Sequence, residues 1–125
     1  MKSTKIIACF IFLGVLLSCN KQEPNASPQP CITGPWYEGN EGYGDYLETD
    51  LNAALSVNAN CSADADSDTL TARWDWTADG TWDTHFISIY TTVNHQYPDT
   101  GWYELVLSVD DGKIAKLKST MVHIK

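Results

Sequence analysis

The chain has 125 residues, with 16 acidic side chains against eight basic ones, and a formal net charge of −8 at pH 7. This length suits one domain with a single core rather than several domains. The acidity disfavours nucleic acid and anionic lipid head groups as partners, because both carry negative charge, but it is compatible with divalent cations, basic proteins and neutral glycans.

Residues 1–18 have the pattern of a bacterial lipoprotein signal peptide. Lys2 and Lys5 precede the uncharged apolar run 6–17, which is shorter than the roughly 20 apolar residues needed to span a bilayer. The sequence Leu-Leu-Ser-Cys that ends at Cys19 resembles the lipobox of bacterial lipoproteins, in which a small residue stands directly before the lipidated cysteine. The sequence therefore predicts cleavage after residue 18.

Cleavage there predicts a mature chain that begins with a lipidated Cys19 and is held at a membrane by buried acyl methylenes, each worth about 0.8 kcal/mol. The alternative is ordinary secretory cleavage nearby, with Cys19 removed or left free. In many diderm bacteria an aspartate after the lipidated cysteine marks retention in the inner membrane. Asn20 stands at that position, so the lipoprotein resemblance favours the outer membrane of the bacterial cell envelope.

A linker and a cysteine pair come next. Residues 19–30 follow the cleavage point, and after Cys19 they are polar, contain three prolines and lack apolar periodicity, which is typical of an extended linker. We expect the folded domain to cover residues 31–125. Its two cysteines, Cys31 and Cys61, lie in a compartment that permits disulfides, so we expect them to pair; two free buried thiols are the alternative.

Short segments with strand patterns follow the linker, and no segment shows a helical stripe. Apolar and polar residues alternate in 55–59 and 103–109, residues 70–76 and 86–93 are rich in β-branched and aromatic side chains, and 113–125 adds a last strand. Asp, Gly and Pro turn signals separate these segments. The order predicts an all-β fold, an antiparallel β-sandwich.

Two separated motifs lie in the second half of the chain. Residues 73–84 read RWDWTADGTWDT, and residues 95–112 begin with HQY and end with GWYELVLSVDDG. These motifs resemble the signature of the PKD (polycystic kidney disease) domain family, which is written WDFDGDGxWDT, HxY and GxYxVxLxVxDxxG. The resemblance covers about residues 48–125. It implies an immunoglobulin-like sandwich, usually an extracellular module for protein or carbohydrate contact. The residues that match the motifs are implied to be structural: Trp74, Asp75, Asp79, Gly80, His95, Tyr97, Gly101, Tyr103 and Asp111.

Physical chemistry supports structural roles for the first motif. Trp74 can fill the space between two sheets, Asp75 can accept backbone N–H groups from the following turn, and Gly80 can adopt a positive φ. In the alternative, Trp74 forms an exposed binding face with Trp76 and Trp82. Core packing is the stronger interpretation for Trp74, whose place in the motif is the buried one.

Asp64, Asp66 and Asp68 are the best metal candidates in the sequence. They follow the first core strand, where the PKD pattern often has an acidic loop, and converging carboxylates could supply oxygen ligands to calcium. The alternative is a solvated loop in which the aspartates close Asx-turns. The sequence leaves both interpretations open.

Trp36, Tyr37, Tyr43 and Tyr46 lie in the glycine-rich segment GPWYEGNEGYGDY, which is the candidate binding segment. Its rings could protrude and stack on sugar rings or on a protein partner. They could also pack on the sandwich from an edge strand, which is favoured because aromatic rings bury large areas.

The pattern of histidines, serines and cysteines predicts no catalytic site, since none stands in a nucleophile elbow or beside a recognisable base motif. We therefore expect a non-catalytic, lipid-anchored envelope protein that contacts a protein or a glycan, with calcium as its one candidate cofactor. A structural or accessory subunit of a larger envelope complex is the second hypothesis. A small hydrolase is a distant third.

Overall fold

The computed structural model describes residues 24–39 and 44–125, and within these ranges the chain forms eight β-strands. The signal peptide, Cys19 and Tyr43 lie outside the described residues. In the described part of the chain, no helix is long and apolar enough to cross a membrane. The strands are β1 (Trp36–Tyr37), β2 (Tyr46–Thr49), β3 (Leu55–Val57), β4 (Thr71–Asp75), β5 (Ile87–Ser88), β6 (Val93–His95), β7 (Gly101–Asp110) and β8 (Ala115–Ile124).

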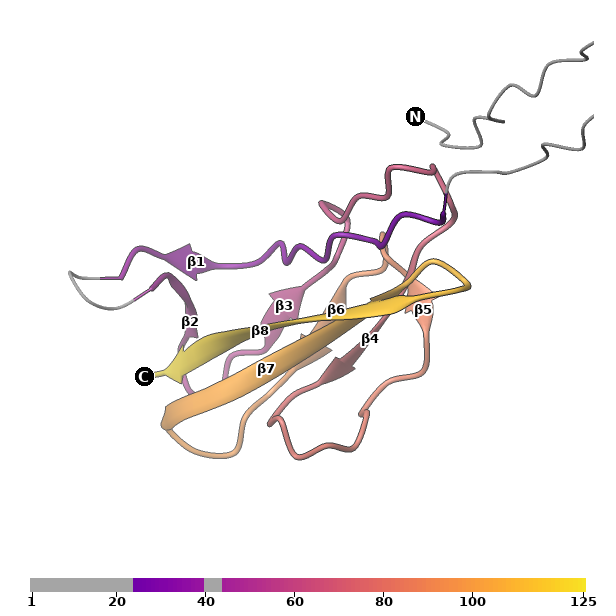
Figure 1. Ribbon diagram of the computed structural model, residues 1–125. Helices are drawn as coiled ribbons and strands as arrows, with labels where there is room; N and C mark the ends of the chain where they lie inside the picture. The colour runs from indigo at the N-terminus through magenta and orange to yellow at the C-terminus, as the bar shows by residue number, and fades with distance from the viewer. Residues whose placement is uncertain (1–23, 40–43) are drawn as a thin grey trace, which may run out of the picture.

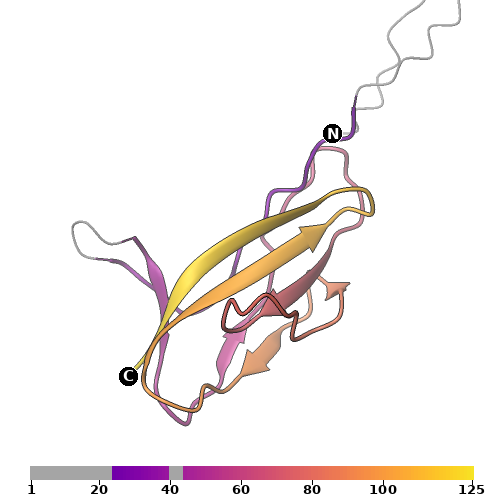
Figure 2. The same cartoon turned by 60° about the horizontal axis from the view of Figure 1, so that its bottom comes forward.

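The strands form two sheets packed as a sandwich (Figure 1). The larger sheet has six strands in the order β1-β2-β8-β7-β4-β5, and the smaller sheet consists of β3 and β6. Figure 2 shows the long β7–β8 hairpin, with the shorter strands of the second layer below it in this view. The structure confirms the all-β sandwich expected from the sequence.

Two details of the strand pairing differ from the sequence-based expectation. β2 pairs with β8 in parallel, so the larger sheet is mixed; alternation of apolar residues defines a strand's faces but not its direction. The expected strand 86–93 is divided into β5 and β6, which belong to different sheets. A turn separates them, in which the amide of Thr91 donates to the carbonyl of Ser88 at 3.0 Å.

The core lies between the sheets and is centred on Trp74, whose side chain is 1% exposed. The Trp74 ring stacks on Trp76 with 5.9 Å between ring centroids. Alternate residues of β7 point into the same core, because successive side chains of a strand face opposite sides. The remaining fully buried large residues include Leu47, Leu55, Leu105, Leu107, Val109, Val122 and Ile124.

A disulfide ties the start of the domain to the loop after β3. Cys31 and Cys61 are bonded, with their Cα atoms 5.3 Å apart, which confirms the expected pairing. Just before it, Gln29 and Ala63 exchange two backbone hydrogen bonds of 2.8 and 3.1 Å. The last residues of the expected linker are therefore packed on the domain rather than extended away from it.

Candidate functional site

The turn after β4 is organised by the carboxylate of Asp75. Asp75 Oδ2 accepts the amide of Gly80 at 3.0 Å, and its Oδ1 accepts the amides of Thr77 and Asp79 at 3.2 and 3.3 Å. Gly80 has a φ of +87°, a conformation that residues with a side chain rarely adopt. This carboxylate is occupied in holding the turn, which is a structural role.

The second motif builds an aromatic stack inside the sandwich. The ring of His95 lies parallel to Trp76 at 4.7 Å and meets Tyr97 edge-on at 4.5 Å. Tyr97 donates its hydroxyl to the carbonyl of Trp76 at 2.7 Å. Burial lowers the pKa of His95 and raises the pKa of Tyr97. His95 thus packs as a neutral ring. The hydroxyl of Tyr103 also donates to the backbone, at the carbonyl of Asp99.

The three tryptophans of the first motif do not form a common exposed face. Trp74 and Trp76 are both buried in the core. Trp82 instead covers the guanidinium group of Arg73, whose Cζ atom lies 4.4 Å from the Trp82 ring and 4.4 Å from the ring of Phe86. Trp82 therefore shields a cation on the outer side of β4.

The loop after β3 and the turn between β7 and β8 bring three carboxylates together. One ligand atom from each of Asp64, Asp68 and Asp111 lies within 4.8 Å of the others, and these three residues are called the acidic cluster below. Asp64 Oδ1 and Asp68 Oδ2 are buried and have no hydrogen-bond partner. Unpartnered buried oxygens are costly in a folded protein.

The electrostatics of the acidic cluster are uneven. Burial raises the pKa of Asp68, and the negative charge of Asp64 raises it further. Burial also acts to raise the pKa of Asp111, but hydrogen bonds from Asn25 and from the amides of Ile114 and Lys113 outweigh it and lower that pKa. Asp68 is therefore the carboxylate that a bound cation would relieve most.

The donor chemistry of the acidic cluster fits calcium, which takes six to eight oxygen ligands from carboxylates, carbonyls and water. Three carboxylates with two unsatisfied oxygens supply part of such a shell. Asp64 also serves the turn that the alternative interpretation expects, because its Oδ2 accepts the amide of Asp68 at 2.8 Å. One carboxylate can do both, since each of its oxygens has two lone pairs.

The acidic cluster differs from the sequence-based set by one residue. Asp66 is not one of its three residues, and its Oδ2 accepts the amide of Ala26 at 2.6 Å. Asp111, absent from the predicted set, takes part from the opposite loop. The sequence motif VxDxxG predicts a structural role for Asp111. Its proximity to Asp64 and Asp68 appears only in the folded structure.

A row of aromatic rings crosses the outer face of the larger sheet. Tyr37 stacks on Tyr46 at 6.0 Å, Tyr46 meets Trp102 edge-on at 5.0 Å, and Trp102 stacks on His123 at 4.4 Å. Trp102 and Tyr37 are 55% and 52% exposed. Trp36 is not part of this row: it alternates with Tyr37 in β1, pairs with Leu47 and donates its indole N–H to the carbonyl of Ile32 at 2.9 Å.

Trp102 is the exposed residue that sequence reasoning missed. It directly precedes Tyr103 in β7. Because successive side chains of a strand face opposite sides of the sheet, Trp102 lies on the outer face. Of the predicted aromatics, the row includes Tyr37 and Tyr46. We define Tyr37, Tyr46 and Trp102 as the aromatic row.

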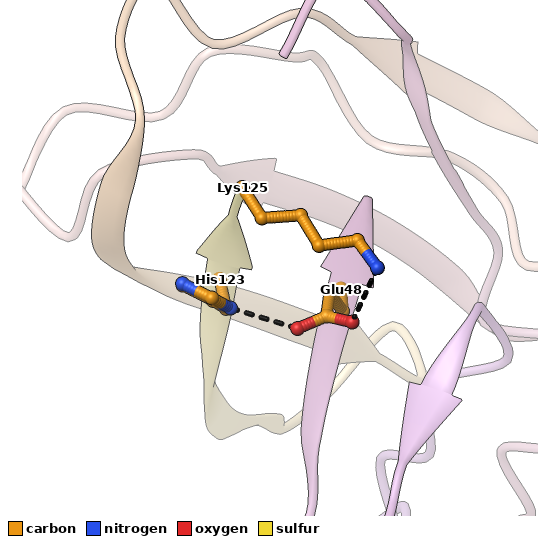
Figure 3. Close-up of polar contacts among 3 residues, drawn as sticks. All are labelled: Glu48, His123 and Lys125. Atoms are coloured by element: carbon orange, nitrogen blue, oxygen red, sulfur yellow. Dashed lines mark hydrogen bonds and ion pairs between the residues drawn. The ribbon is translucent and has the colours of Figure 1, made fainter. Parts of the chain in front are cut away.

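The row rests on a charged network formed where β2 runs parallel to β8 (Figure 3). Glu48 Oε2 lies 2.7 Å from His123 Nδ1, and Glu48 Oε1 lies 3.2 Å from Lys125 Nζ. The hydrogen bond from His123 is the main cause that lowers the pKa of Glu48, and Glu48 in turn raises the pKa of Lys125. Glu48 thus fixes the imidazole beneath Trp102 and pairs with a nearby cation.

Comparisons with known proteins identify the family. The family model described as "PKD domain" matches residues 43–124. The chain is similar in structure to a nucleoside hydrolase-related hypothetical protein from Saccharophagus degradans that is associated with carbohydrate metabolism, with a TM-score of 0.57 and 20% sequence identity. The match covers 81% of this chain and 26% of that protein. This chain thus spans about a quarter of that protein.

The chain is also similar to the PKD domain of an M14-like peptidase from a Thermoplasmatales archaeon, with a TM-score of 0.56 and 17% sequence identity. The match covers 81% of this chain and 98% of that domain. Identities this low show the fold alone. No protein with a curated description matches the chain. Because the family model spans most of the sequence and both signature motifs lie inside the match, the chain belongs to the PKD domain family, with its immunoglobulin-like sandwich.

Proposed function

We propose that the protein is a lipid-anchored, non-catalytic binding module of the bacterial cell envelope, which contacts a protein or a glycan through the aromatic row. PKD domains are typically non-catalytic extracellular modules. The observation that carries the proposal is the exposure of Tyr37 and Trp102 on an open sheet face. Clustered exposed rings are typical of recognition surfaces, since they offer large apolar area at little cost in side-chain entropy.

The anchor follows from the lipobox-like sequence at Cys19, and Asn20 favours the outer membrane. Metabolic labelling with an alkyne fatty acid tests it. The wild-type protein should be labelled and sediment with membranes, whereas Cys19→Ala should be unlabelled and soluble, because the acyl chains supply the membrane affinity. Equal labelling of both proteins would exclude lipidation at this cysteine.

A second candidate function, an accessory subunit of an envelope complex, is supported by the open edge of β8. β2 accompanies β8 only from Val122 to Ile124, and Leu117, earlier in β8, is 63% exposed. An edge of this kind can accept a strand from another protein. Crosslinking in intact membranes separates the two candidates. A companion recovered in stoichiometric amount favours the accessory role, and its loss in Leu117→Lys would assign the contact to β8.

The proposal also assigns calcium to the acidic cluster as a structural ligand. A cation held by Asp64, Asp68 and Asp111 would join the loop after β3 to the β7–β8 turn and relieve the repulsion among the carboxylates. Millimolar calcium should then raise the thermal unfolding midpoint of the mature protein by at least about 5 °C over chelator, if calcium is well above its Kd.

Asp68→Asn is the matched test of this calcium assignment. The variant should lose the calcium response, and its midpoint in chelator should be at or above that of wild type, because a partly buried negative charge beside Asp64 and Asp111 has been removed. Asp99→Asn changes an exposed aspartate outside the cluster and should leave the response intact. If calcium does not raise the unfolding midpoint of the wild type, or raises that of Asp68→Asn by the same amount, the acidic cluster is not a calcium site.

A further inference from the structure

A pocket of about 740 Å³ opens on the outer face of the larger sheet, where β2 and β8 separate. Tyr46 from β2 and Met121 from β8 line it just ahead of the paired residues of those strands. Trp102 and Glu104 line it from β7. Sites for small ligands typically enclose roughly 300–1,000 Å³, so this pocket is large enough for a few sugar rings.

The indole of Trp102 is held in place before any ligand arrives. His123 stacks on one face with an angle of 18° between the rings, and Tyr46 approaches at 68°. His123 is itself fixed by Glu48 (Figure 3). More than half of Trp102 remains exposed, which leaves a flat apolar surface for a partner. A preorganised ring loses little side-chain freedom on binding.

The polar groups of the pocket are hydrogen-bond acceptors and hydroxyls. Asp45 and Glu104 contribute carboxylates, and Ser119 and Thr120 contribute hydroxyls. The described residues that line the pocket include no lysine or arginine, and the nearby Lys125 is paired with Glu48. Such a lining repels anionic ligands and offers acceptors to a ligand rich in hydroxyl groups.

We propose that this pocket binds a neutral carbohydrate chain, with the apolar C–H face of one sugar ring on Trp102 and sugar hydroxyls donating to Glu104 and Asp45. The inference rests on the proposed function and names its ligand class. Carboxylates beside the central rings argue for a sugar over a protein partner, because Asp and Glu are depleted from the cores of protein interfaces. Aromatic walls with a few placed polar groups are the usual composition of small-ligand sites.

Titration calorimetry on the mature protein tests the proposal, in a detergent whose head group contains no sugar. The probes are neutral hexasaccharides of the cellulose, amylose, mannan and chitin types, with oligogalacturonate as the anionic comparison. At least one neutral probe should bind saturably and the anionic one should not. Trp102→Ala should weaken that binding by at least about tenfold, the loss expected at a central aromatic contact.

Two further variants keep the test independent of folding. Tyr90→Ala removes an even more exposed ring, 74% exposed, that lies outside the pocket lining, and it should leave the affinity unchanged. Glu104→Ala removes an exposed acceptor and should also weaken binding. Each variant should keep the wild-type unfolding midpoint within about 3 °C, a shift that corresponds to a small stability change.

Binding of no neutral probe by the wild type, or equal affinity in wild type and Trp102→Ala, would overturn the carbohydrate proposal. The proposed function can fail separately. A wild-type protein that binds no saccharide but holds an envelope protein, and releases it in Trp102→Ala, would reject the glycan and retain the binding module. If neither a saccharide nor a protein is held through Trp102, both proposals fail.

Discussion

Replacing Trp74 with alanine is expected to lower the free energy of unfolding by about 3 to 5 kcal/mol, the cost of emptying a large aromatic site in a core. The indole is 1% exposed, lies between the sheets and stacks on Trp76. A domain of this size is stable by about 5–15 kcal/mol, so the variant should be close to unfolding. Urea titration followed by circular dichroism measures the loss.

The matched control is Trp102→Ala, which removes the same side chain from the outer face of the same sheet. Trp102 is 55% exposed, so its removal should change the free energy of unfolding by no more than about 1 kcal/mol. A Trp74→Ala protein as stable as Trp102→Ala would contradict the core assignment. The contrast also separates the tryptophan that builds the fold from the one proposed to bind a ligand.

The sandwich could be predicted from the sequence because its central strands each bury one face. In β7 the apolar residues Leu105, Leu107 and Val109 stand at alternate positions, as in a strand that turns one face to the core, and all three are buried. The parallel pairing of β2 with β8 could not be predicted, since it joins strands from opposite ends of the domain. The division of 86–93 between two sheets was hidden for a related reason, because β-branched residues suit either sheet.

The acidic cluster was predictable only in part. Asp64 and Asp68 stand close together in the sequence, and alternate acidic residues in a loop suggested converging ligands. Asp111 joins them through the β7–β8 turn, a long-range contact that local spacing does not encode. Asp66 has the same residue type as its neighbours, yet it binds the amide of Ala26 on the expected linker.

The aromatic row shows the same limit. Tyr37 and Tyr46 are candidates from sequence because they lie in a glycine-rich segment, whereas Trp102 belongs to a regular strand with no such signal. The register of the larger sheet places Trp102 opposite His123, and the pairing of β2 with β8 brings Tyr46 to the same face. Surface sites assembled across strands require the register, which follows from packing rather than from any single motif.

Loss of the Cys31–Cys61 disulfide is expected to lower the free energy of unfolding by about 3 to 4 kcal/mol in the chain-entropy model, because the bond closes a loop with a sequence separation of 30. Cys61 is exposed, so a reductant should reach the bond. Urea titration of the mature protein with and without reductant measures the effect. The double variant Cys31→Ala/Cys61→Ala should have the same free energy of unfolding as the reduced protein, and reductant should not change it.

The same change should weaken the calcium response. The disulfide adjoins the backbone bridge between Gln29 and Ala63, and Asn25, a few residues earlier, donates to Asp111 at 2.7 Å. Without the bond, the segment around Asn25 loses its nearest covalent attachment to the loop that carries Asp64. The calcium-induced rise in the unfolding midpoint should therefore be smaller in the double cysteine variant than in wild type. A rise of equal size in both would mean that the acidic cluster is held by the sandwich alone.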